Sequence, residues 1–76
     1  MARFYFHIRN ASHLTLDEEG MDLAGIVEAR IEARLSAGDL AMAAMRGGNG
    51  VNGGEIEIAD ERGTVLGACA VRALLN

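Results

Sequence analysis

The sequence predicts an α+β domain: a four-stranded antiparallel sheet in the order β-β-α-β-β, with one long helix packed on one face. Three observations predict this class. Residues 3–9 and 55–59 alternate apolar and polar side chains with the period of two that is typical of half-buried strands. Residues 23–45 are rich in alanine and arginine, which favour helix. Glycine-rich and acidic stretches separate these segments and mark turns.

The first strand, residues 3–9, carries different chemistry on its two faces. Its apolar face is Phe4, Phe6 and Ile8, which we expect to enter the core. The opposite face of the predicted hairpin collects the functional groups. The candidate interaction residues there are Tyr5, His7, Arg9 and His13.

A second strand, residues 13–17, is expected to pair with the first through a three-residue loop at 10–12. This loop would set Arg9 opposite His13, Ile8 opposite Leu14 and Phe6 opposite Leu16, which keeps all apolar side chains on one face. A two-residue loop would mix the faces, so we predict the longer one. The acidic run 17–20 then ends the hairpin as a solvated turn rather than as a calcium loop.

The helix is expected from Leu23 to Met45, with Asp22 as its N-cap. It would be longer than the strands, so it either extends past the sheet or breaks, and Gly38-Asp39 is the expected position of a break. It carries two apolar stripes instead of one. The small stripe is Ile26, Ala29, Ala33, Ala37, Leu40 and Ala44. The large stripe is Val27, Ile31, Leu35, Met42 and Met45. A single sheet face covers one stripe, so we expect the large stripe to form a homodimer contact. The alternative is a broad stripe that sinks into a curved sheet.

The second half of the chain completes the sheet. Residues 47–54 are a glycine-rich connection whose GxGxxG string follows a helix, which is the wrong context for a dinucleotide site. A strand at 55–59, a turn at 60–63 and a strand at 64–71 follow, and we expect both faces of the last strand to be partly covered. Residues 72–76 form a tail that extends the dimer contact or frays. Opposite charges across the first and third strands favour a 2-1-3-4 order over a split arrangement with the first and last strands in the centre.

Composition narrows the function classes. The 76 residues make one domain, 1–76, with seven basic and eleven acidic residues, a net charge of −4 and no lysine. This balance disfavours nucleic-acid binding. A single cysteine excludes an internal disulfide and fits a cytoplasmic location. We find no secretory pattern and no apolar run long enough to span a membrane.

Few residues suggest catalysis, and we expect no catalytic residue, no cofactor and no enzyme. Cys69 in an apolar strand is typical of a core residue. The less favoured metal hypothesis uses His7 and His13 as ligands, with Asp17 or a partner subunit completing the shell. Arg30 and Arg34 could clamp an anion, although pairing with nearby carboxylates is the more common role.

The segments at 3–9, 17–23, 28–33 and 56–63 together resemble a small bacterial family catalogued as domain of unknown function 6894. The resemblance covers nearly the whole chain, and the glycine-rich stretch 47–54 departs from the family pattern. It implies the domain boundaries and a bacterial cytoplasmic setting, and it implies no activity, substrate or site residue.

The function expected from the sequence is a non-catalytic homodimeric module that binds another protein or a small ligand on its hairpin face. An antitoxin-like or regulatory protein that neutralises a partner is the second possibility, by fold-level analogy alone. The metal-binding protein described above is the third.

Overall fold

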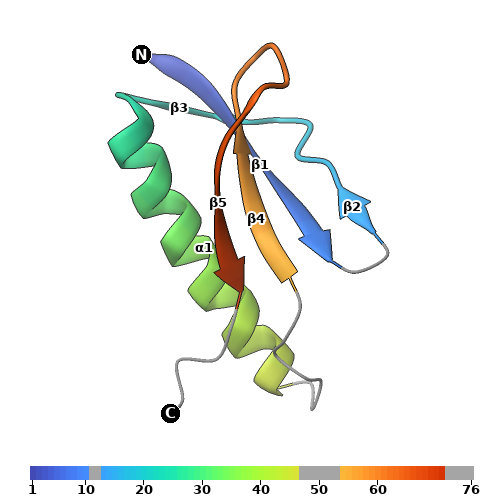
Figure 1. The fold of residues 1–76 in the computed structure, drawn as a ribbon. Helices are drawn as coiled ribbons and strands as arrows, with labels where there is room; N and C mark the ends of the chain where they lie inside the picture. The colour runs from blue at the N-terminus through green and yellow to red at the C-terminus, as the bar shows by residue number, and fades with distance from the viewer. Residues whose placement is uncertain (11–12, 47–53, 72–76) are drawn as a thin grey trace.

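The computed structural model describes residues 1–10, 13–46 and 54–71, with the backbone alone for 44–46. It is an antiparallel sheet with one helix on one face, which confirms the α+β class (Figure 1). The elements are β1 (Ala2–Asn10), β2 (Leu14–Thr15), β3 (Met21–Leu23), α1 (Ile26–Arg46), β4 (Gly54–Ala59) and β5 (Val65–Val71). The glycine-rich connection at 47–53 and the tail at 72–76 lie outside the described residues.

The strand order is β2-β1-β4-β5, with the short β3 beside β1 on the same side as β2. This confirms the predicted order and excludes the split arrangement. The charge argument behind it holds for Arg9, which lies opposite Glu55 and whose guanidinium bonds to the neighbouring Glu57.

The predicted register of the first hairpin is wrong by one residue. Ile8 pairs with Thr15 and Arg9 with Leu14. The backbones of Asn10 and His13 bond to each other, and the Asn10 side chain accepts a further bond from the His13 amide at 3.0 Å. These bonds set a two-residue connection. A one-residue shift in strand pairing is costly only where one face of the strand is buried. Since α1 does not cover β2 and both residues of β2 are exposed, apolar matching does not fix the register of this hairpin.

β3 was not predicted, and it changes the start of the helix. Asp22, the expected N-cap, lies in β3 opposite Arg3, and the two side chains form an ion pair at 3.2 Å. The helix therefore begins later, at Ile26, where the Gly25 carbonyl accepts the amide of Ala29 at 3.0 Å. Asp22 would be a favourable N-cap by local preference, but its pairing with β1 keeps it in a strand instead.

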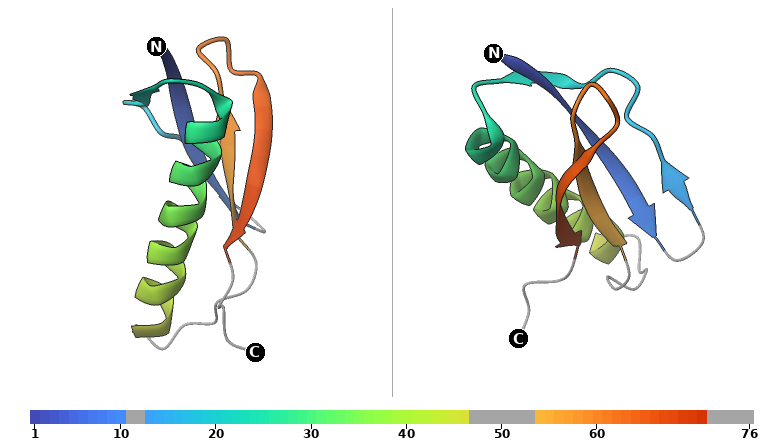
Figure 2. Two further views of the ribbon diagram at one scale, coloured as in Figure 1. Left: turned by 90° about the vertical axis from the view of Figure 1, so that its left-hand side faces the viewer. Right: turned by 45° about the horizontal axis from the view of Figure 1, so that its top comes forward.

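α1 is continuous through Gly38, so of the two alternatives the helix extends past the sheet and does not break. The buried residues Ala37 and Ala41 on either side hold this turn against the sheet, which offsets the cost of about 1 kcal/mol for a mid-helix glycine. With 21 residues at 1.5 Å each the helix is about 31 Å long. Its C-terminal end extends past the ends of β4 and β5 (Figures 1 and 2).

The core lies between the small stripe of α1 and the apolar face of the sheet. The buried residues of this cluster are Phe4, Ala29, Ala33, Ala37, Ile56 and Ile58. Because alanine has no bulk beyond Cβ, the helix approaches the strands closely and the sheet supplies the large side chains. The structure therefore decides which stripe faces the sheet, and it is the small one.

β5 differs from its prediction in one respect. Its exposure alternates, so that Leu66, Ala68 and Ala70 are exposed. A single helix covers one face of the sheet, which leaves the other face of β5 in solvent. The turn before it is confirmed: the Asp60 side chain accepts the amides of Arg62 and Thr64 at 2.9 Å, and Gly63 has a φ of +84°.

Candidate functional site

The open face of the hairpin holds three of the predicted interaction residues on β1. The Tyr5 and His7 rings are stacked with centroids 6.4 Å apart, and the Arg9 guanidinium bonds to the Glu57 carboxylate of β4. His7 Nδ1 accepts the amide of Asp17 at 3.0 Å. The face is thus an ordered row of ring and charged groups. Its role in binding stays a prediction.

Asp17 organises the chain between β2 and β3. Its carboxylate accepts the amide of Phe6 at 3.0 Å and the amides of Glu19 and Gly20 at 3.1 Å. Partial burial raises the pKa of Asp17, but these three hydrogen bonds and the neighbouring His7 lower it more, so the pKa lies below its ordinary 3.8. The predicted solvated acidic turn is therefore tied to the sheet at its first residue, a role that the sequence analysis missed.

The metal hypothesis receives no support from the geometry. It required His13 to be a diagonal neighbour of His7, and the observed register does not form that arrangement. In the part of the chain that the structure describes, no three side chains of His, Cys, Asp or Glu lie close enough together to hold a metal ion.

The large stripe of α1 lies on the side of the helix away from the sheet. Its exposed fractions are 62% for Val27, 55% for Ile31, 61% for Leu35 and 53% for Met42. The side chain of Met45 lies outside the description. Carboxylates border the stripe on one side and arginines on the other. The result is an uncharged aliphatic strip along an otherwise charged helix.

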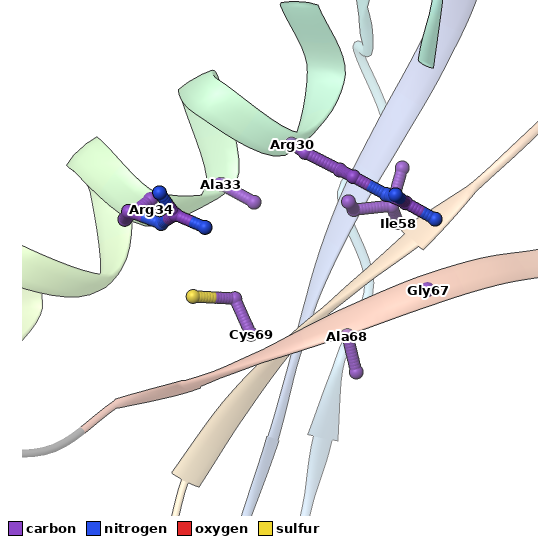
Figure 3. A pocket seen from close by; sticks show the side chains of 7 residues that line it. All are labelled: Arg30, Ala33, Arg34, Ile58, Gly67, Ala68 and Cys69. Carbon is purple, nitrogen blue, oxygen red and sulfur yellow. The ribbon is translucent and has the colours of Figure 1, made fainter. Parts of the chain in front are cut away.

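A hollow of about 190 Å³ lies between α1 and the edge strand β5 (Figure 3). Arg30 and Arg34 border it from the helix, and Gly67 and Cys69 border it from β5. Within the described residues neither guanidinium forms an ion pair or a hydrogen bond, so the predicted pairing with carboxylates is not formed. The sequence analysis named both arginines but could not connect them to a strand more than thirty positions away.

A second hollow, of about 290 Å³, lies on the other side of α1 over β1 and β4. Its lining is Phe6, Ile8, Ser36, Asp39, Leu40 and Ile56. It is wide and mostly apolar, and it offers a ligand one carboxylate and one hydroxyl. We assign it no chemistry.

The search for membrane-spanning segments gave none: within the described residues, no helix combines the length and the apolar character that a span requires.

Comparison with known proteins adds one finding. A family model described as "Domain of unknown function (DUF6894)" matches residues 3–72, which confirms the resemblance stated above. No curated protein and no solved structure matches the chain.

Proposed function

We propose that this chain, which belongs to the DUF6894 family, is a non-catalytic interaction module that works as a homodimer joined through the outer faces of two α1 helices. One observation carries the proposal: four large aliphatic side chains in a row on one helix are each more than half exposed. They are Val27, Ile31, Leu35 and Met42.

We place the protein in the bacterial cytoplasm, where the single, partly buried Cys69 stays reduced.

A second copy fits this strip better than a charged partner does. The strip contains no charged residue, so an isologous contact would set aliphatic side chains against aliphatic side chains. Gly38 lies between Leu35 and Met42 with open space around it, which lets another helix come close at that point. Close approach of backbones increases the contact made by the side chains on either side.

The expected dimer is weak and depends on concentration. Burying the remaining exposed half of an aliphatic side chain contributes about 1 kcal/mol, so eight side chains from two copies contribute roughly 8 kcal/mol. Association costs about 4–15 kcal/mol in lost translational and rotational freedom. Set against the lowest of these costs, the gain leaves about −4 kcal/mol, which corresponds to a dissociation constant of about 1 mM.

Sedimentation velocity over a range of concentrations tests the proposal. We expect the wild-type chain to shift from monomer toward dimer between about 0.1 and 2 mM, and the Leu35→Glu variant to stay monomeric over that range. Leu16→Glu is the matched control, because Leu16 is exposed to a similar extent, 57%, but lies beside β2 and not on the helix. A wild-type chain that is still fully monomeric at about 2 mM, or an equal effect of both substitutions, would refute the dimer.

A further inference from the structure

We infer that the groove between α1 and β5 binds an extended, acidic segment of a partner protein, which adds as a new strand beside β5 and places carboxylates against Arg30 and Arg34. This inference goes beyond the proposed dimer and does not require two copies. It concerns the side of α1 that faces the sheet edge rather than the outer strip.

The first argument is the edge itself. Among the described strands β5 pairs with β4 alone, so along its other side alternate amide and carbonyl groups have no strand partner. Proteins usually protect such an edge with charged side chains, proline or a bulge within the strand. Val65–Val71 contains no charged residue and no proline, and its one irregularity lies at the start. The remaining residues offer an uninterrupted edge to another strand.

The second argument is the space beside the edge. α1 and β5 run side by side in the same general direction, and the hollow of about 190 Å³ lies between them (Figures 2 and 3). Figure 3 shows Arg30 extending from α1 toward β5, and Cys69 pointing from β5 toward the helix. Gly67 adds no side chain to the hollow, and the nearest atom to a Cβ built there is Ile58 Cδ1 at 4.0 Å.

The third argument is charge. No carboxylate lines the hollow, and its two guanidinium groups have no partner among the described residues. Arginine presents a planar fork of donors that suits a carboxylate. This local positive surface belongs to a chain whose net charge is −4, which distinguishes it from the rest of the molecule. An acidic ligand is therefore favoured at the groove.

Spacing supports an extended ligand in particular. Arg30 and Arg34 are four residues apart, which is about 6 Å along a helix. Alternate residues of an extended strand are about 6.6 Å apart and point to the same side. A segment lying along β5 would thus present two acidic side chains, separated by one residue, to the two arginines in turn.

Pairing of β5 with β5 of a second copy is the other way to cover the edge, and charge disfavours it. Antiparallel pairing about a two-fold axis would bring two copies of Arg30 and Arg34 together beside the new strand pair. Four guanidinium groups without carboxylates would repel each other. The same four charges are no obstacle to an acidic segment.

Fluorescence anisotropy with a labelled eight-residue peptide of alternating Glu and Val tests the inference. We expect the wild-type chain to bind it at least tenfold more tightly than the matching Gln and Val peptide. The Arg30→Gln/Arg34→Gln double variant should lose at least tenfold in affinity. Arg62→Gln is the control for losing an exposed arginine outside the groove, because Arg62 lies in the turn before β5, and we expect a change of less than twofold.

Amide chemical-shift mapping on the bound complex locates the peptide, and the largest changes are expected between Val65 and Val71. Equal binding of the Glu and Gln peptides would overturn the inference, as would an Arg62→Gln loss as large as that of the double variant. Shifts confined to the two arginines, reproduced by inorganic phosphate, would reduce the site to an anion clamp and overturn strand addition. Leu35→Glu should bind the peptide normally, so failure of the dimer and failure of this site are distinguishable.

Discussion

The two edges of the sheet are protected to very different extents. On the β2–β3 side the edge is interrupted once: two short strands pair with β1, and the chain between them does not continue the regular ladder. On the β5 side one strand of seven residues runs along β4 and ends the sheet. The two edges also differ in their cover, because α1 packs beside β5 and does not cover β2.

The protected edge is held by bonds that replace a regular ladder. Between the Ile8–Thr15 pair and the Phe4–Met21 pair, β1 contributes three residues and the edge chain five. Asp17 accepts three amides within this gap, and Arg3 bonds to the Glu19 carbonyl and to Asp22. Another strand cannot pair where side chains already occupy the ladder. Among the described residues no side chain from another element bonds along the outer side of β5, which leaves this edge open to a partner.

Removing Asp17 should have the largest effect on the protected edge. In Asp17→Ala the amides of Phe6, Glu19 and Gly20 lose their acceptor, and hydrogen bonds to a charged group contribute about 1.5–3 kcal/mol. We expect the free energy of unfolding in urea to fall by about 2–3 kcal/mol. Glu18→Ala, the change of an adjacent exposed carboxylate, should stay within about 0.5 kcal/mol of the wild type. Equal losses in the two variants would show that Asp17 does not hold this edge.

Gly20→Ala should have the next largest effect, because two costs add. Gly20 has a φ of +73°, and a Cβ there would lie 2.9 Å from Tyr5 Cε2 and 3.0 Å from the Phe4 carbonyl oxygen. We expect a loss of about 2 kcal/mol. Gly63→Ala carries a similar φ of +84° with nothing within 4 Å of its Cβ, so it should lose only about 1 kcal/mol. Chemical denaturation of both variants separates backbone strain from the close approach to β1, and equal losses would contradict that approach.

Acid should weaken the protected edge through Asp17. Because the folded-state pKa of Asp17 lies below 3.8, the unfolded chain binds more protons than the folded chain near that pH, and stability rises with pH there. The contribution of the carboxylate is therefore complete above its unfolded pKa and is lost as the pH falls through the folded pKa. The stability difference between the wild type and Asp17→Asn should shrink as the pH falls below 3.8. A difference that stays constant between pH 6 and pH 2.5 would contradict this assignment.

The regular parts of the fold could be predicted because their signals are local. The strands around Phe4 and Ile56 follow from the alternation of apolar and polar side chains. The two stripes of α1 follow from apolar residues at helical spacing. The choice between the stripes could not be made, since both are apolar. It depends on Ala29 and Ala33 allowing a closer approach to the sheet than Val27 and Ile31 would allow.

The two edges were harder to predict because they depend on segments far apart in the chain. Asp17 in an acidic run followed by glycine is typical of a solvated turn, and only the return of the chain past Phe6 gives its carboxylate three donors. The hairpin register was predicted by matching apolar side chains on one face. This criterion fails because β2 is exposed and gains nothing from such matching. The groove joins Arg30 and Gly67, which no motif connects.

Gly67→Ala gives the smallest effect and the most direct contrast between the edges. Gly67 lies within β5 without a positive φ, and its new Cβ would meet only Ile58 Cδ1 at an ordinary 4.0 Å. Removing glycine freedom from the unfolded chain at such a position stabilises a protein by about 0.4–1 kcal/mol. The same substitution that costs about 2 kcal/mol at Gly20 should therefore raise the free energy of unfolding here. A loss of stability in Gly67→Ala would mean that the space beside β5 is already filled, and the groove proposed as a binding site would lose its physical basis.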